Sequence, residues 1–162
     1  MSATEKNRLL AAVLAELEAE LAALAKAQRS TQDGAVHEEM RAEGDKDMRA
    51  TEAAYLARGQ ALRVAELENA CLLLSRFECE EFGATRAIAA GALVTLASPR
   101  GRRRVLLLPA GAGVRVQSST GSIGVITPAS PIGSALLGRL QGDSIDVDLD
   151  DRTDEYDIER VE

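Results

Sequence analysis

A repeating apolar spacing in the first half of the chain constrains the fold more than any other feature. Five leucines near the amino terminus alternate at steps of four and three residues: Leu10, Leu14, Leu17, Leu21 and Leu24. Four apolar residues further along repeat this pattern: Val64, Leu67, Cys71 and Leu74. The spacing is typical of the a and d positions of a coiled coil, which lie on one face of a helix. Residues 4–80 are also rich in strong helix formers, so two long helices are predicted there.

The stretch between the two patterns indicates that the helices fold back on each other as an antiparallel hairpin. If residue 8 faces about residue 77, the turn is centred on Glu43-Gly44-Asp45 and the tip falls near residues 40–47. Gly44 is the residue best able to take a positive φ at such a turn. Continued backwards, the second pattern meets only small or polar residues: Gln60, Ala57, Ala53 and Ala50. The two helices are therefore expected to approach closely in that half.

The second half of the chain has the composition of short strands and turns. From about residue 84 it is rich in Val, Ile, Thr, Gly and Pro. Six strands are predicted, at residues 92–97, 103–108, 114–117, 123–126, 144–149 and 154–161. A short helix over residues 131–140 is predicted between the fourth and fifth strands, with Ser130 as its cap and Pro131 in its first turn. Its expected apolar side consists of Ile132, Leu136, Leu137 and Leu140.

These patterns predict an α+β protein with two parts. Residues 1–80 are expected to form the antiparallel coiled-coil hairpin with its acidic tip. Residues 84–162 are expected to form an antiparallel sheet that covers one short helix. The apolar content of 46% is normal for a globular protein, and about 80 residues suffice for a small core.

Charge and composition exclude several classes of function. The net charge is −7, and residues 143–162 alone hold ten acidic and two basic residues. Such a chain does not seek DNA by itself, and an aromatic content of 2% disfavours the stacking of bases. One His and two Cys exclude a zinc cluster. With no export signal and no apolar run of roughly 18 residues, we expect a cytoplasmic protein without a membrane span.

The hairpin tip is the first candidate site. Five carboxylates crowd within ten residues: Glu38, Glu39, Glu43, Asp45 and Asp47. Carboxylates at the end of a rod cannot enclose a divalent ion, but they can complete the shell of a Mg²⁺ that another molecule holds. The simpler interpretation is a solvated turn, since helical hairpins commonly end in polar residues.

Two further segments carry alternative interpretations. Arg100-Gly101-Arg102-Arg103-Arg104 is expected at a turn between strands, where Arg102, Arg103 and Arg104 can contact phosphate or an acidic protein surface. The alternative is an exposed turn that aids solubility, and the acidic C-terminal strand is a candidate neighbour. Ser130-Pro131-Ile132-Gly133 is a capped helix start by its local chemistry, and its exposed edge is a candidate docking surface.

Residues 123–142 read IGVITPASPIGSALLGRLQG and are followed by Asp143. This segment resembles the C-terminal signature of the GreA/GreB transcript-cleavage factors of bacterial RNA polymerase. The matching residues are Ser130, Pro131, Ile132, Ala135, Leu136, Leu137, Gly138, Gly142 and Asp143. Gly91-Ala92-Leu93-Val94-Thr95 is similar to the family's Gly-Ala-x-Val stretch, and a coiled coil before this domain is the family layout.

The resemblance implies an FKBP-like domain that docks on the rim of the polymerase's secondary channel, with Ser130, Pro131 and Ile132 as partner-binding residues. It implies that the coiled coil reaches down the channel, where Asp45 and Asp47 would help hold the second catalytic Mg²⁺. The polymerase's own active site would then hydrolyse backtracked RNA. On this view the chain is a monomer and not itself an enzyme, binds no cofactor tightly, shares Mg²⁺ with the polymerase and touches nascent RNA only indirectly.

The tip departs from the family pattern, which is Gly-Asp-x-x-Glu-Asn-Ala-Glu-Tyr. Gly44-Asp45 is present, but Met48 and Arg49 stand where the family has Glu and Asn. Only Asp45 therefore carries over, and Asp47 is a substitute by geometry. The stretch from Asp47 to Glu52 also resembles the acidic tip of DksA-type secondary-channel regulators, so a regulator without cleavage activity is the alternative.

Two functions from other classes remain. An FKBP-like prolyl isomerase needs an aromatic-lined pocket, and Phe82 and Tyr156 are the only aromatic residues after residue 80, which disfavours this function. A coiled-coil adaptor is the other, because the leucine pattern of residues 10–24 suits an intermolecular partner as well as an internal one.

Overall fold

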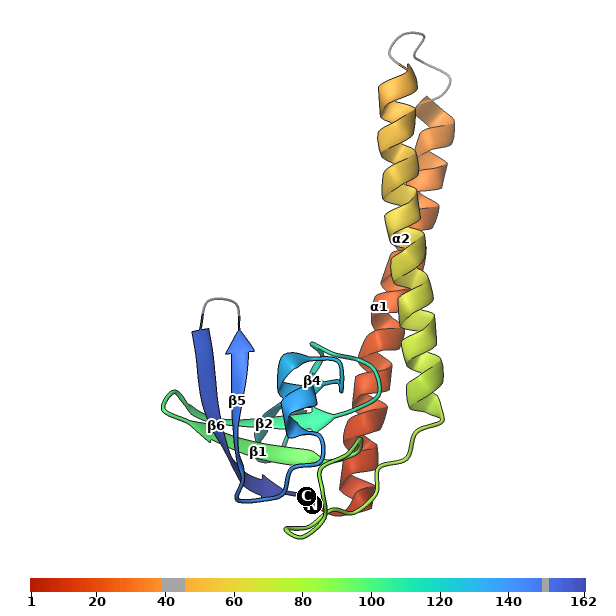
Figure 1. Cartoon of the computed structure of the whole chain (residues 1–162). Helices are drawn as coiled ribbons and strands as arrows, with labels where there is room; N and C mark the ends of the chain where they lie inside the picture. Colours follow the sequence, from red (N-terminus) through yellow and green to blue (C-terminus); the bar gives the residue numbers. More distant parts are fainter. Residues whose placement is uncertain (39–45, 150–151) are drawn as a thin grey trace.

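The computed structural model describes the backbone of residues 1–38, 46–149 and 152–162, and the side chains of these except 28–38, 46–50, 53, 149 and 152. Two long helices, α1 (Ala3–Glu38) and α2 (Lys46–Ser75), run antiparallel and project from a sheet with one short helix, α3 (Pro131–Leu136) (Figure 1). The predicted α+β fold class is confirmed. None of the described helices has a stretch that is both long and apolar enough to cross a membrane.

The sheet has six strands, each within about three residues of its predicted bounds. They are β1 (Leu93–Ser98), β2 (Gly101–Leu107), β3 (Arg115–Ser118), β4 (Gly121–Ile126), β5 (Ser144–Leu149) and β6 (Arg152–Val161). Their spatial order is β3-β4-β2-β1-β6-β5.

The sheet is mixed, whereas the sequence predicted antiparallel pairing throughout. β2 and β4 pair in parallel, with Arg104 opposite Ile123 and Leu107 opposite Ile126, and the other four pairs are antiparallel. The physical reason is the connection after β2. A loop with Gly111 and Gly113 at φ of +84° and +90° carries the chain to the sheet edge, so that β3 forms the edge and β4 returns beside β2.

The two faces of the sheet bury separate cores. One face packs on the base of the hairpin and contributes Leu93, Leu106, Leu108, Val116, Ile123 and Val125. The other face packs on α3, and residues of β1, β2, β6 and α3 form the second core: Val94, Leu96, Val105, Leu107, Ile132, Leu136, Tyr156 and Ile158. The alternation of side chains along β1 and β2 produces this division, because successive residues of a strand point to opposite faces.

The lower half of the hairpin confirms the predicted apolar seam. Leu10, Leu17, Leu67 and Leu74 are buried in the core that faces the sheet, and Leu14, Leu21, Leu24 and Cys71 pack against it. Gly111 of the loop after β2 lies against this base, since a Cβ there would be 3.2 Å from Val13 Cγ1.

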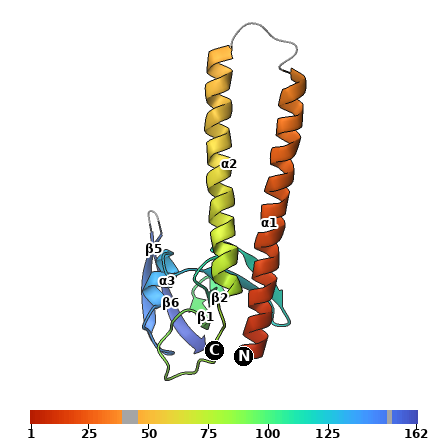
Figure 2. The same ribbon diagram turned by 90° about the vertical axis from the view of Figure 1, so that its right-hand side faces the viewer.

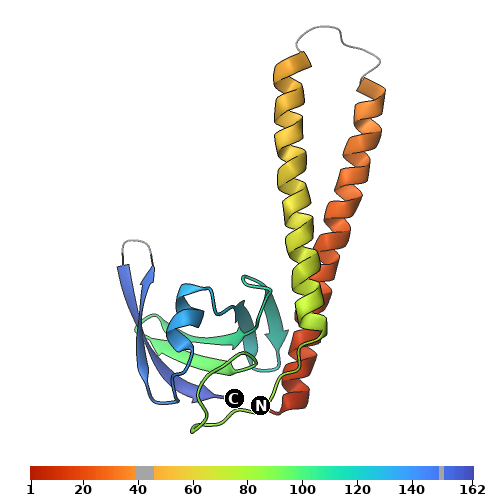
Figure 3. The same cartoon turned by 45° about the vertical axis from the view of Figure 1, so that its right-hand side comes forward.

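The upper half does not show the predicted close approach. Ala57 is exposed, and Leu56 is 64% exposed. Figures 2 and 3 show the two helices diverging towards their far ends. The alanine side chains offer too little apolar area to hold two helices together without support from the sheet. Ala50 and Ala53 lie among the side chains that are not described.

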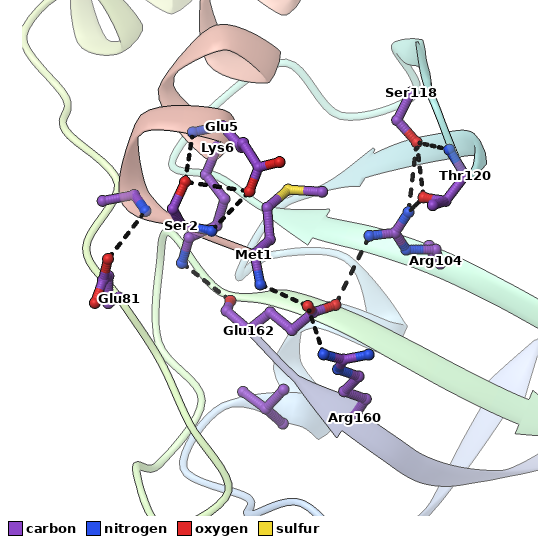
Figure 4. Close-up of polar contacts among 12 residues, drawn as sticks. Met1, Ser2, Glu5, Lys6, Glu81, Arg104, Ser118, Thr120, Arg160 and Glu162 are labelled. Carbon is purple, nitrogen blue, oxygen red and sulfur yellow. Dashed lines mark hydrogen bonds and ion pairs between the residues drawn. The ribbon is translucent and has the colours of Figure 1, made fainter.

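Lys6 fixes α1 to the rest of the molecule. Its side chain is fully buried, and its ammonium donates to the carbonyl oxygens of Glu80 and, at 3.0 Å, Gly91. It also donates, at 3.0 Å, to the carbonyl oxygen of Glu162 (Figure 4). It also lies 4.7 Å from the ring centroid of Phe82. Burial lowers the pKa of Lys6 below the ordinary lysine value. One side chain thus joins α1 to the segment after α2 and to the end of β6.

Candidate functional site

The hairpin end carries the predicted Mg²⁺ ligands. Asp45 lies outside the described residues, as do Glu39 and Glu43 of the tip. Asp47 lies in the first turn of α2, and its side chain is not described. That turn is at the end of the hairpin remote from the sheet (Figure 1). Convergence of Asp45 and Asp47 on one ion stays a prediction, and the described residues hold no group of three or more potential metal ligands.

The start of α3 is built as the sequence predicted. Ser130 is the N-cap, with its backbone extended at φ −75° and ψ 151°. Its Oγ accepts a hydrogen bond from the Gly133 amide at 3.1 Å and donates to the Thr127 carbonyl at 2.8 Å. Gly133 admits no side chain, because a Cβ there would lie 1.9 Å from the Thr127 oxygen. The loop is therefore held in one shape by its own chemistry.

Of the three residues that were predicted to bind a partner, Ser130, Pro131 and Ile132, not all are accessible at the surface. Ile132, expected to bind a partner, is only 7% exposed and lies in the core with Leu136. Ile132 therefore holds the loop against the core. Ser130 is half-buried and occupied by the cap, whereas Pro131 is exposed.

The helix is shorter than predicted, and this places two leucines at the surface. α3 ends at Leu136, and Gly138 follows with φ +78°. The amide of Gly138 donates to the carbonyl of Ile88, so the backbone pairs with the segment after α2 and does not continue the helix. Leu137 and Leu140, expected on the apolar side, are 41% and 40% exposed.

Pro131, Leu137 and Leu140 together form the exposed apolar residues around α3, here called the α3 patch. The sequence interpretation missed Leu137 and Leu140 as surface residues. The signal that could have revealed them is Gly138, because glycine commonly ends a helix in the left-handed conformation. A helix that ends there turns the following leucines away from the core.

The arginine segment lies mostly on a strand, and the predicted turn takes only its first residues. Gly101 has φ +117° at the β1–β2 turn, and Arg102 to Arg104 belong to β2. Arg102 donates two hydrogen bonds to Glu159 of β6, at 2.7 and 2.8 Å, and this carboxylate raises the pKa of Arg102. The guanidinium of Arg100 forms an ion pair with the carboxylate of Asp154, with 3.3 Å between nitrogen and oxygen. The acidic C-terminal strand β6 is thus separated from β2 by β1, and the arginine side chains reach it across β1.

Arg104 and Arg103 point to opposite faces of the sheet. Arg104 contacts the hydroxyls of Ser118 and Thr120 and lies 3.8 Å from a Glu162 carboxylate oxygen (Figure 4). Arg103 lies over the ring of Tyr156, 4.9 Å from its centroid. Contact of these arginines with phosphate stays a prediction.

No protein-family sequence profile matches this chain, and no curated protein matches its sequence. Among solved structures, the GreA factor homolog 1 (Gfh1) of Thermus thermophilus is similar, with 29% identity, 94% of each chain covered and a TM-score of 0.39. Thermus aquaticus Gfh1 is 27% identical over 92% of this chain and 90% of that chain, with a TM-score of 0.39. A transcription elongation factor GreA/GreB from Nitrosomonas europaea is 20% identical over 71% of this chain and 94% of that chain, with a TM-score of 0.36. TM-scores this low do not assign a function to this chain.

Proposed function

We propose that this chain is a transcription elongation factor that binds bacterial RNA polymerase and places its helical hairpin in the secondary channel. Two features of the chain support this. Residues 123–143 resemble the GreA/GreB signature, and their Ser-Pro-Ile loop is held rigidly by the Ser130 cap and Gly133. The hairpin before this domain has the layout that the resemblance implies.

The observation that carries the proposal is the free upper half of the hairpin. α1 has 36 residues and α2 has 30, which correspond to about 54 and 45 Å at 1.5 Å per residue. The core that joins hairpin to sheet includes α1 residues up to Leu24 and α2 residues from Leu67 onward. Beyond these residues the hairpin stands clear of the sheet (Figure 1). A rod of this length that stands clear of the sheet is suited to entering a narrow channel.

The α3 patch is the proposed dock on the polymerase. Pro131, Leu137 and Leu140 present apolar area on a loop whose backbone is fixed, so little conformational entropy is lost on binding. The patch lies on the sheet domain, apart from the upper hairpin (Figure 3). Docking and insertion are therefore separable by mutation.

Fluorescence anisotropy with purified core RNA polymerase tests this dock. The double variant Leu137→Glu/Leu140→Glu is expected to weaken binding by about a hundredfold, since each leucine contributes over 1 kcal/mol at an interface centre. Leu73→Glu, a leucine of similar exposure (44%) at the hairpin base, is the matched control and should bind like the wild type. Equal loss in both variants, or no binding by the wild-type chain, would contradict the proposal.

The finer proposal concerns the tip. Asp45 and Asp47 would supply carboxylates to a Mg²⁺ held mainly by the polymerase, which would then hydrolyse backtracked RNA, and the chain would not be an enzyme by itself. The support is Gly44-Asp45, which matches the family motif. Met48 and Arg49 favour the alternative, in which the chain occupies the channel as a DksA-like regulator without cleavage.

RNA cleavage in a backtracked polymerase complex with Mg²⁺ separates these two versions. If the chain stimulates cleavage, Asp45→Ala/Asp47→Ala should abolish the stimulation while binding persists. Binding without stimulated cleavage would establish the regulator. Absence of binding would leave the adaptor function, for which sedimentation would show a dimer that dissociates on dilution.

A further inference from the structure

β5 forms a free edge of the sheet. It is the last strand in the spatial order and pairs with β6 alone. The β5–β6 pair extends beyond β1 and β2 (Figure 1). β3, the strand at the opposite edge, is shorter and lies against α1. Within the described part of the chain, no segment other than β6 forms hydrogen bonds with the backbone of β5. A strand at the end of a sheet offers a row of unpaired backbone groups to another strand.

Backbone alternation shows which groups of β5 face the free edge. The amide of Ile158 in β6 donates to the carbonyl oxygen of Asp143, immediately before β5, at 2.8 Å. Backbone groups of successive residues in a strand point to opposite edges. Ile145 and Val147 therefore pair with β6. The N–H and C=O groups that face the free edge belong to the alternate residues: Ser144, Asp146 and Asp148.

The same alternation gives β5 one acidic face and one apolar face. Ile145 and Val147 are buried in the core that includes α3, whereas Ser144, Asp146 and Asp148 are exposed. A strand added at this edge would continue both faces, so its own side chains would alternate between them. Those on the exposed face would lie about 5 Å from the side chains of β5.

Residues of β6 add to the negative charge of the exposed face. The strand register places Asp146 directly opposite Glu155, and Asp148 and Asp157 lie on either side of this pair. Neither Asp146 nor Glu155 forms an ion pair with any described residue. Like charges directly opposite each other in a sheet are destabilising. Basic side chains beside them would relieve this repulsion.

We propose that the β5 edge binds an extended basic segment of a partner protein, antiparallel to β5, in which Lys or Arg alternates with apolar residues. Backbone hydrogen bonds would hold the segment, and its basic side chains would lie beside Asp146 and Asp148. A second copy of this chain is disfavoured, because antiparallel pairing of two such edges would place their acidic faces side by side. The same carboxylates repel nucleic acid.

Fluorescence anisotropy of a labelled peptide, Lys-Val-Lys-Val-Lys-Thr, tests the inference with the full chain at low salt. The peptide has six residues, as β5 has. Its binding should be saturable, and a peptide with the same residues but grouped lysines should bind about fivefold more weakly, since only alternate side chains share a face. RNA polymerase is absent, so the result is independent of the proposed function.

Methylation of peptide nitrogens tests the backbone pairing without altering the protein. Residues directly opposite each other have side chains on the same face, so the lysine amides would face β5 and the valine amides would face away. Methylation of the lysine amides should raise the Kd more than tenfold, because the donors to β5 are lost. Methylation of the valine amides is the matched control and should change the Kd by less than about twofold.

Variants of the chain test the same edge from the protein side. Asp146→Pro removes an N–H that faces the free edge and leaves the pairing with β6 intact, so the Kd should rise about tenfold. Asp146→Asn keeps this N–H and should raise the Kd about threefold through the lost charge. Glu18→Gln removes the same charge from an exposed site on α1 and should leave the Kd unchanged.

Four results would overturn the inference. They are the absence of saturable binding, equal binding of the two methylated peptides, equal binding of the grouped-lysine peptide, and equal weakening by Glu18→Gln and Asp146→Asn. Sedimentation addresses the remaining occupant. A wild-type dimer that Asp146→Pro dissociates would assign the edge to a second copy of the chain and would also overturn the inference.

Discussion

The base and the upper half of the hairpin share one sequence pattern but differ in packing. At the base, Leu17 and Leu74 are buried between the two helices and the loop at Gly111. In the upper half, Leu56 and Ala57 are exposed and the helices diverge (Figure 2). The difference shows that the coiled-coil spacing alone does not close the seam, and that large side chains and support from the sheet hold it closed at the base. It also separates the stabilising part of the hairpin from the part free to meet a partner.

Truncation of a leucine should have the largest effect on stability, and the effect should differ between the two regions. Leu74→Ala leaves a cavity against Gly111 and the core, so we expect a loss of about 3 kcal/mol in the free energy of unfolding. Leu62→Ala removes the same atoms from a side chain that is 62% exposed in α2 and should change stability by about 0.5 kcal/mol or less. Urea unfolding of both variants measures the two values, and equal losses would contradict the division.

Alanine in place of glycine should act with opposite signs in the two regions. Gly111→Ala forces a φ of +84° on alanine and brings its Cβ to 3.2 Å from Val13 Cγ1, so a loss of about 2 kcal/mol is expected. Gly59→Ala in α2 meets no neighbour and should stabilise by up to about 1 kcal/mol through helix propensity. Thermal unfolding checks the signs, and a destabilised Gly59→Ala would show that this part of α2 is packed after all.

Lys6, at the base of the hairpin, should make the stability of the protein depend on pH. Burial lowers the pKa of Lys6 in the folded state below 10.5, so between that lowered pKa and 10.5 the unfolded chain binds more protons. The contribution of this group to stability is therefore lost as pH falls through the folded-state pKa and fully present above 10.5.

Lys6→Met removes this dependence. Relative to the variant, the wild type should gain free energy of unfolding as pH rises towards 10.5. Lys26→Met, at an exposed position of α1, should keep the wild-type dependence. Urea unfolding at a series of alkaline pH values measures the slopes, and parallel curves for the wild type and Lys6→Met would refute the assignment.

Local patterns predicted much of the fold. The heptad spacing identified Leu10, Leu17, Leu67 and Leu74 because large apolar side chains on one helix face must be buried. Strand composition placed all six strands for a similar local reason. The parallel pairing of β2 with β4 was missed, since it depends on where a long loop returns the chain, which local propensity does not determine.

In the candidate site, too, local features were predictable and features that depend on distant residues were not. The Ser130 cap was predictable, because capping is a contact between near neighbours in sequence. The burial of Ile132 and the exposure of Leu137 and Leu140 were not, since they follow from pairing of residues 138–139 with Ile88. For Arg102 and Arg104 the sequence indicated the acidic C-terminal strand as a neighbour, but it could not identify Glu159 and Glu162 as the partners, because they lie more than fifty residues away.

Site-specific photo-crosslinking to RNA polymerase from the upper hairpin tests insertion into the secondary channel directly. Tyr55, which is 80% exposed on α2, would be replaced by a photoreactive phenylalanine derivative, and the same derivative would replace the exposed Gln117 of β3 as a reference. Insertion of the hairpin predicts crosslinks from position 55 to polymerase segments that line the secondary channel, and the loss of these crosslinks in Leu137→Glu/Leu140→Glu. Crosslinks from position 117 alone, with none from position 55, would contradict insertion of the hairpin.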